Sequence, residues 1–148
     1  MIKHIIIVSF AIGLLIFTSC DNQQPANDAV QMRKEVQTYF QDSIPKVIWE
    51  YPEGNTEEIK VSHYYHNQKL KMRGYLVGGV RNGKWIAWDD KGNMLSMGHY
   101  NDGFEEGMWT VWFPSGVKRY EGLFKAGKRS GMWNFWNSEG ELVKEIEY

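Results

Sequence analysis

The sequence predicts a mainly β protein, a single-layer antiparallel meander of stacked β-hairpins that follows one amphipathic N-terminal helix. Three observations predict this fold: a 24-residue repeat without insertions, short aromatic and β-branched runs within each copy, and glycine-ended turns between the runs. A repeat of this length forms one supersecondary unit that buries its apolar surface against neighbouring copies. We therefore expect an elongated molecule.

The repeat is clearest in the second half of the chain. Copies begin at Gly83, Gly107 and Gly131, and each has tryptophan at its third and sixth positions. A weaker copy precedes them, so the array should cover residues 57–148. The expected copies are residues 59–82, 83–106, 107–130 and 131–148.

Each copy contains the signals of a β-hairpin. In the third copy, two runs rich in aromatic and β-branched residues, 107–113 and 117–124, flank a turn that ends at Gly116. Glycine at the end of such a turn adopts a left-handed conformation at little cost. A second turn, of the type Asp102-Gly103, joins one hairpin to the next. The chain should therefore run as a meander.

The two tryptophans of a copy are three residues apart, an odd spacing that sends them to opposite faces of a strand. We expect the face with Trp85, Trp109 and Trp133 to be the core, with Gly98 and Gly122 as packing residues.

The opposite face is the candidate binding surface for a protein partner. Sheet curvature and long side chains covering its apolar residues are the alternative interpretation. The candidate residues are Trp88, Trp112, Trp136, Met108 and Met132.

The N-terminus has the features of a secretory signal over residues 1–19. Lys3 precedes an apolar run, residues 5–17, that is shorter than the about 20 residues a membrane-spanning helix needs. Residues 17–20, FTSC, resemble a bacterial lipobox, which implies that Cys20 is lipidated. The following segment is polar with one proline, so residues 20–28 are expected to form a tether. This resemblance implies a membrane-anchored lipoprotein of the bacterial cell envelope, with the membrane leaflet left open. Cys20 is the single cysteine, so no internal disulfide is possible.

Residues 29–56 are expected to form the helix and an entry strand. Ala29, Met32, Val36 and Tyr39 recur at three- and four-residue steps, and Pro45 would stop the helix. The helix would cover the near end of the array, and residues 46–51 would enter the sheet.

Little in the sequence indicates catalysis, a metal site or nucleic-acid binding. The formal net charge is −1, which gives no basic field for nucleic acid. His63 and His66, placed on one strand, would point to opposite faces and could not share a metal. We expect no enzyme activity and no cofactor. Glutamates of the last strand, Glu145 and Glu147 among them, are explained by protection of an exposed sheet edge.

Residues 120–133 read YEGLFKAGKRSGMW, which resembles a MORN repeat, and residues 98–109 follow the same pattern. Tryptophan after the last glycine makes the chain similar to the bacterial MORN-variant, YwqK-type antitoxin family. The resemblance implies a curved sheet of stacked hairpins that contacts proteins or organises a scaffold at a membrane. Some members are called antitoxins, so it also implies an immunity role, which for a lipid-anchored chain would lie at the cell envelope.

A second resemblance supports an alternative function. Residues 83–94, GKWIAWDDKGNM, look like the choline- or glucan-binding wall repeats of Gram-positive surface proteins. That resemblance implies binding of a glycan or a quaternary amine between successive hairpins. The leading expectation is a lipid-anchored module that binds a protein, and the alternative is a glycan- or cell-wall-binding domain.

Overall fold

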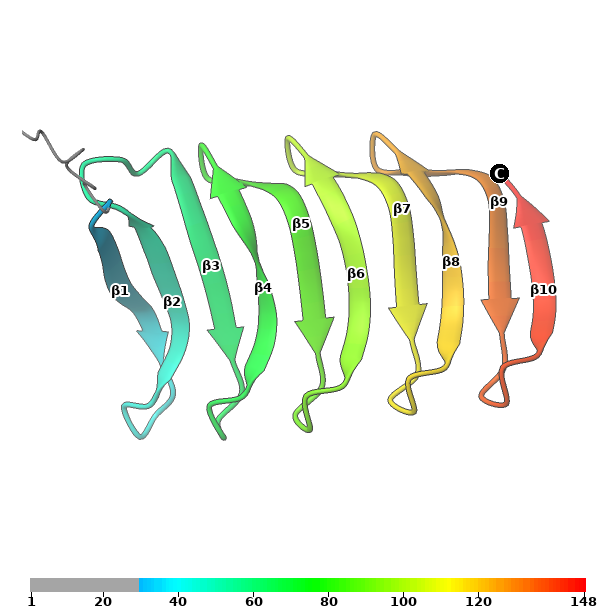
Figure 1. Cartoon of the computed structure of the whole chain (residues 1–148), viewed down its shortest axis with the longest axis horizontal. Coiled ribbons are helices and arrows are strands. Elements are labelled where there is room, and N and C mark those ends of the chain that lie inside the picture. Colours follow the sequence, from blue (N-terminus) through cyan, green and yellow to red (C-terminus); the bar gives the residue numbers. More distant parts are fainter. Residues whose placement is uncertain (1–29) are drawn as a thin grey trace, which may run out of the picture.

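The computed structural model describes residues 30–148, and this part of the chain contains ten β-strands and no helix. The strands form one antiparallel sheet in which spatial order equals chain order (Figure 1). The predicted antiparallel meander is therefore confirmed. The strands are β1 (Met32–Tyr39), β2 (Pro45–Pro52), β3 (Glu58–Tyr64), β4 (Leu70–Val77), β5 (Val80–Trp88), β6 (Met94–Asn101), β7 (Phe104–Trp112), β8 (Lys118–Lys125), β9 (Lys128–Trp136) and β10 (Leu142–Glu147).

Two kinds of turn alternate along the sheet. At one edge, a five-residue turn closes each of five hairpins through the same pair of backbone hydrogen bonds, with its fourth residue at positive φ. At the other edge, the two-residue turns after β4, β6 and β8, such as Asp102-Gly103, have both residues at positive φ, the type I′ geometry that matches strand twist. Residues 53–57 form a longer connection from β2 to β3. The five-residue turns begin at Phe40, Tyr65, Asp89, Phe113 and Asn137.

The first hairpin, β1–β2, is a fifth copy that the sequence analysis did not identify. Ser43 (φ 65°) and Gln68 (φ 62°) hold the positions that glycine holds in the later copies. These two residues adopt the left-handed conformation although neither is glycine. The turns therefore keep the same geometry, but the glycine that would reveal them in the sequence is missing.

The expectation of a helix is wrong where the structure describes the segment, because Met32–Tyr39 forms strand β1. Met32 and Val36 are four residues apart, and an even spacing puts side chains on one face of a strand as readily as on one stripe of a helix. Pairing with β2, which carries Val47, Ile48 and Trp49, decides in favour of the strand. The first residues of the expected helix, with the signal peptide, Cys20 and most of the tether, lie outside the described residues.

The sheet is a single layer, so each face is identified by a row of cross-strand partners. One row runs through all ten strands, from Val36 through Thr110 to Glu145. Met108 and Met132 share the face of this row, which we call the methionine face. The other side, with Trp85, Trp109 and Trp133, we call the tryptophan face. No second layer covers either face within residues 30–148 (Figure 1).

An aromatic ladder holds the tryptophan face together. Six rings from β5 to the C-terminal residue meet edge to face, with centroids 5.0 to 6.1 Å apart. This is the arrangement that the ring quadrupole favours. Trp133 is 0% exposed even though the sheet has one layer, because rings of the preceding copy, Tyr120 and Phe124, and of its own copy, Phe135 and Tyr148, surround it. The rings are Trp85, Tyr100, Trp109, Phe124, Trp133 and Tyr148.

The tryptophans of the ladder lie directly on glycines of the preceding strand. Gly74, Gly98 and Gly122 each face an indole so closely that a Cβ there would overlap the ring. The indole nitrogen of Trp133 also donates a hydrogen bond of 3.0 Å to the carbonyl oxygen of Leu123. Each indole therefore joins one copy to the previous one by packing on its backbone.

Gly122→Ala should destabilise the fold by roughly 1 to 3 kcal/mol, the usual range for overpacking, because its methyl group overlaps the Trp133 ring. The measurement is the free energy of unfolding from urea titrations. In a Trp133→Leu background the same substitution should cost much less, and an equal cost in both backgrounds would contradict the proposed clash.

Candidate functional site

Three of the residues proposed for binding are less open than the sequence analysis assumed. Trp88, Trp112 and Trp136 lie on the methionine face but are only partly exposed. The ammonium of Lys118 lies 5.5 Å from the centroid of the Trp136 ring and 2.7 Å from the Glu121 carboxylate. The rings therefore do not form a continuous flat aromatic platform.

The exposed apolar surface of this face lies beside the tryptophans. Met108 is 53% exposed and Met132 is 49% exposed. Leu123, which pairs with Met108 across β7 and β8, is 44% exposed. The two methionines were predicted from the sequence, and Leu123 was not. Its place two residues beyond Glu121, on the same face, is the signal that would have identified it.

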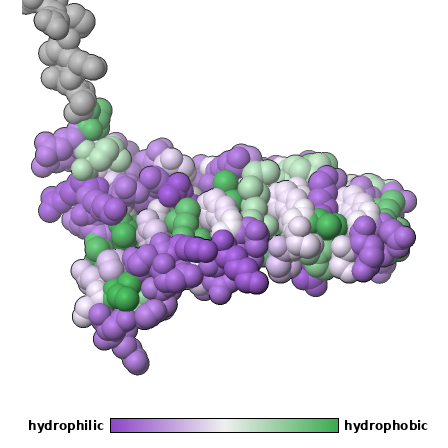
Figure 2. Space-filling model, turned by 60° about the horizontal axis from the view of Figure 1, so that its bottom comes forward, coloured by the Kyte–Doolittle hydropathy of each residue, from purple (hydrophilic) through white to green (hydrophobic). Residues whose placement is uncertain are grey.

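Hydrophobic groups are spread along the sheet and separated by hydrophilic ones on the side of the molecule that Figure 2 shows. A shallow opening of about 290 Å³ lies beside Trp112 and is lined also by Asn93, Met94 and Gly116. Trp112 therefore borders a shallow, open depression.

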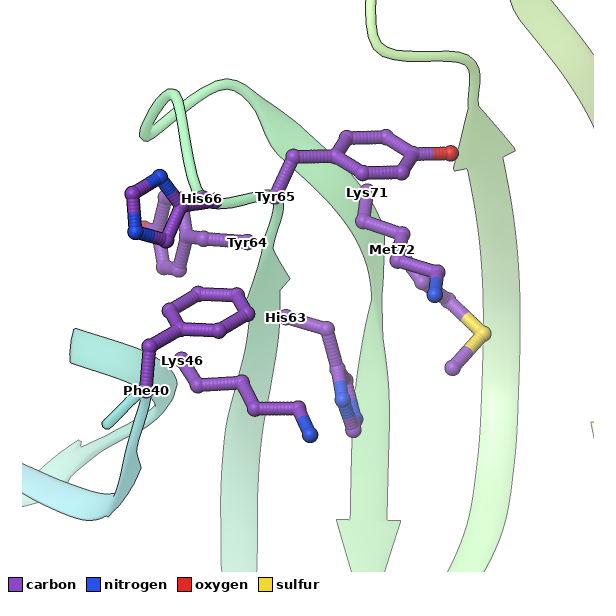
Figure 3. A pocket seen from close by; sticks show the side chains of 8 residues that line it. All are labelled: Phe40, Lys46, His63, Tyr64, Tyr65, His66, Lys71 and Met72. Atoms are coloured by element: carbon purple, nitrogen blue, oxygen red, sulfur yellow. The ribbon is translucent and has the colours of Figure 1, made fainter. Parts of the chain in front are cut away.

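A larger pocket lies at the other end of the sheet, where the first two copies meet (Figure 3). Its volume is about 380 Å³, within the range of small-molecule sites. The lining combines aromatic and apolar side chains with lysines and histidines. The residues are Phe40, Lys46, His63, Tyr64, Tyr65, His66, Lys71 and Met72.

Two equivalent cation–π pairs frame this pocket. Lys46 lies 5.6 Å from the Phe40 ring centroid, and Lys71 lies 5.3 Å from that of Tyr65. In both pairs the aromatic residue begins a five-residue turn and the cation follows six positions later. The same spacing recurs once more, as Phe113 and Arg119, 5.6 Å apart. This spacing was a sequence signal for the pocket that the sequence analysis did not use.

His63 lies between the two lysines, on β3. Partial burial lowers the pKa of its imidazole below the ordinary value of 6.5, and the positive charges of Arg81, Lys71 and Lys46 lower it further. Lys46 and Lys71 have no carboxylate within ion-pair distance among residues 30–148. The pocket therefore carries positive charge that its own walls do not neutralise.

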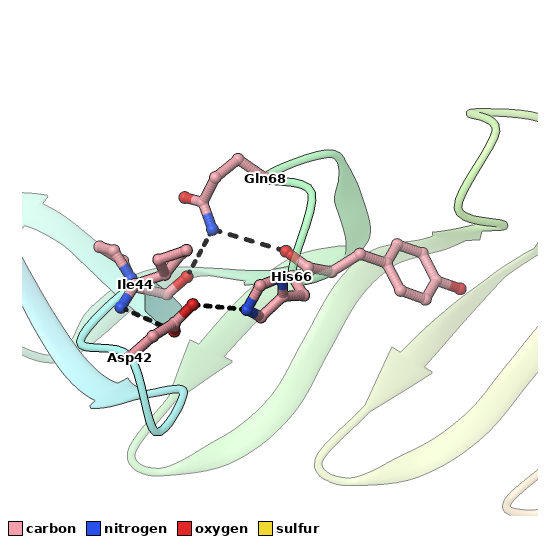
Figure 4. Close-up of polar contacts among 6 residues, drawn as sticks. Asp42, Ile44, His66 and Gln68 are labelled. Atoms are coloured by element: carbon pink, nitrogen blue, oxygen red, sulfur yellow. Dashed lines mark hydrogen bonds and ion pairs between the residues drawn. The ribbon is translucent and has the colours of Figure 1, made fainter.

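Hydrogen bonds between successive turns fix the rim of the pocket (Figure 4). The His66 ring and the Asp42 carboxylate are 2.6 Å apart, and the Gln68 amide donates to the carbonyl oxygen of Pro45 at 3.1 Å. Desolvation raises the pKa of Asp42, but the hydrogen bonds with His66 and from the Ile44 N–H, together with the charge of His66, outweigh it, so the pKa is lowered overall. The first turn is thus fastened to the second.

The placement of His63 and His66 differs from the expectation. Strand β3 ends at Tyr64, so His66 lies in the turn, where strand alternation no longer applies. Both histidines consequently line the same pocket. Within residues 30–148 no group of three or more histidine, cysteine, aspartate or glutamate side chains is arranged to hold a metal ion.

The structural repeat residues keep equivalent places in successive copies. Gly83, Gly107 and Gly131 all have positive φ, of 66°, 76° and 64°. Each lies next to an irregularity in strand pairing that turns the following tryptophan onto its glycine. In the part of the chain that the structure describes, no helix has the length and apolar character needed to cross a membrane.

Comparison with known proteins gives no match to a family model, to a curated protein or to a solved structure. The resemblance to MORN repeats therefore stays a prediction from the residues and the spacing.

The lowered pKa of His63 predicts a pH-dependent stability. Between pH 6.5 and the lower folded-state value, the unfolded chain binds more protons than the folded one, so stability should fall as pH falls. His63→Gln should weaken this dependence in urea unfolding measured from pH 7.5 to 5.5.

The control is His99→Gln, which changes an exposed histidine on β6 and should leave the dependence unchanged. An undiminished pH dependence in His63→Gln would show that His63 does not cause it.

Proposed function

We propose that this protein is a lipid-anchored, non-enzymatic interaction module of the bacterial cell envelope. It binds a protein partner through the methionine face and is held at the membrane through lipidated Cys20. The observation that carries the proposal is the exposed row of Met108, Leu123 and Met132, on a sheet face that no second layer covers within residues 30–148.

Apolar surface of this kind is costly to leave in water and is a usual mark of a protein contact. Methionine adds an unbranched, polarizable side chain that fits irregular partner surfaces. Met108 and Leu123 are direct cross-strand partners, and Met132 follows on β9. The row can therefore enter one interface as a unit.

The geometry favours a protein over the alternative, a glycan or cell-wall ligand. Sugars and quaternary amines are commonly held against open aromatic faces. Here Trp88, Trp112 and Trp136 are partly covered, and Lys118 already lies over Trp136. The exposed side chains beside these rings, Met108, Leu123 and Met132, are not aromatic.

The anchor and the biological role rest on the sequence alone. The lipobox-like residues 17–20 support lipidation, and two or three acyl chains hold a protein at a membrane far longer than one. The resemblance to the antitoxin family supports immunity against an envelope-acting toxin as the role of the contact. No cofactor and no nucleic acid take part in this function.

Met108→Ser combined with Met132→Ser should weaken partner binding about tenfold or more, because it removes two exposed apolar contacts. The partner is first captured from envelope extract with the affinity-tagged full chain, and its affinity for each variant is then measured. A captured protein that is toxic when expressed alone would support the immunity role.

The matched control is Met32→Ser. Met32 is 56% exposed on the same face, at the far end of the sheet, and its loss should leave binding unchanged. Equal binding by all variants would rule out the methionine face. Saccharide captured without protein, and lost in the double variant, would favour the glycan alternative.

Cys20→Ala should release the protein from the membrane fraction, because the acyl chains would have no attachment point. Fractionation and metabolic labelling with a palmitate analogue measure this. Lipidation at Cys20 would be contradicted if the wild-type protein and Cys20→Ala both stayed in the membrane fraction and neither took up the label.

A further inference from the structure

We propose that the pocket between the first two copies is a binding site for a small organic anion with an aromatic or aliphatic body and a carboxylate as its charged group. This site is separate from the methionine face and does not depend on the proposed function. The pocket has the size of a small-molecule site, about 380 Å³, and combines an apolar wall with cations that no described carboxylate neutralises.

The charge of the pocket selects an anion. Lys46, His63 and Lys71 come from three neighbouring strands, and their side chains gather around one opening in Figure 3. The carboxylate of Asp42, on the rim of the pocket, is engaged by His66 at 2.6 Å. Arg81 adds positive charge behind His63 but is itself held by Tyr100, to whose hydroxyl it donates at 2.9 Å.

The wall of the pocket selects an apolar body. Phe40, Tyr64, Tyr65 and Met72 supply rings and a thioether, which would not replace the hydration of a free inorganic ion. An amphiphilic ligand places its apolar part on these side chains and its carboxylate among the cations. The lysines already lie over Phe40 and Tyr65, which holds their ammonium groups near the opening.

The pocket belongs to this pair of copies alone within the described chain. The third aromatic–cation pair, Phe113 and Arg119, has no such pair in either adjacent copy, because Asp89 and Asn137 begin the adjacent turns. Val111 stands there in the place of His63, as the register of the sheet shows. Arg119 is therefore a matched control for the two lysines.

The probe is 3-phenylpropionate, with its neutral amide, 3-phenylpropanamide, as the comparison. The full-length chain is embedded in phosphatidylcholine nanodiscs, and the ring signals of labelled histidines are followed by NMR. Assignment uses His63→Gln and His66→Gln. The carboxylate should shift the His63 signal in a saturable way, and the amide should not.

The pKa of His63 gives a second measurement. A bound anion stabilises the imidazolium, so 3-phenylpropionate should raise this pKa, and binding should strengthen as the pH falls through it. Lys46→Gln with Lys71→Gln should raise the pKa without any ligand, since two repelling charges are gone, and should weaken binding at least fivefold.

Lys46→Arg with Lys71→Arg should retain binding, and Arg119→Gln should leave both binding and the His63 pKa unchanged. Equal binding of the amide, equal weakening by Arg119→Gln, or a His63 pKa that does not respond to the carboxylate would each overturn the proposal. These measurements involve no protein partner, so a negative result would not bear on the proposal that the methionine face binds a protein.

Discussion

The packing of one tryptophan on one glycine, repeated at three of the four boundaries between copies, is the contact on which most of the structure depends. A single-layer sheet has no opposing layer to bury its residues, so burial must come from within the sheet. The indoles of Trp85, Trp109 and Trp133 supply it by lying on the strand before them. The rings of Tyr100 and Phe124 lie between successive indoles, and that of Tyr148 packs on the last one. Glycine is required because a single methyl group would occupy the volume of the ring.

Most of the sheet was predictable because its turns are encoded locally. Gly92, Gly116 and Gly140 mark left-handed positions that other residues adopt only at a cost, so their spacing reports turn geometry directly. The first hairpin was missed where Ser43 and Gln68 accept that cost. Spacing alone could not separate strand from helix in β1, because steps of four fit both and pairing with β2 decides between them.

The two candidate sites could be predicted from the sequence to different extents. Alternation placed Met108 and Met132 on the face opposite Trp109, but it could not show that Lys118 covers Trp136. The anion pocket depends on Lys46 and Lys71 becoming neighbours, which follows only once β1 and β2 are recognised as a copy. Its sequence signal, an aromatic residue followed by a cation six positions later, is visible in retrospect.

Within residues 30–148 the sheet is open at both ends, and each strand bonds only to the strands before and after it in the chain. Copy number is thus an independent variable: a gain or loss of 24 residues would lengthen or shorten the molecule by two strands while leaving every remaining boundary as it is. The number of copies therefore sets the length of the molecule. The sheet separates the pocket between the first two copies from Met108, Leu123 and Met132 by a distance that duplication can change without redesigning either site.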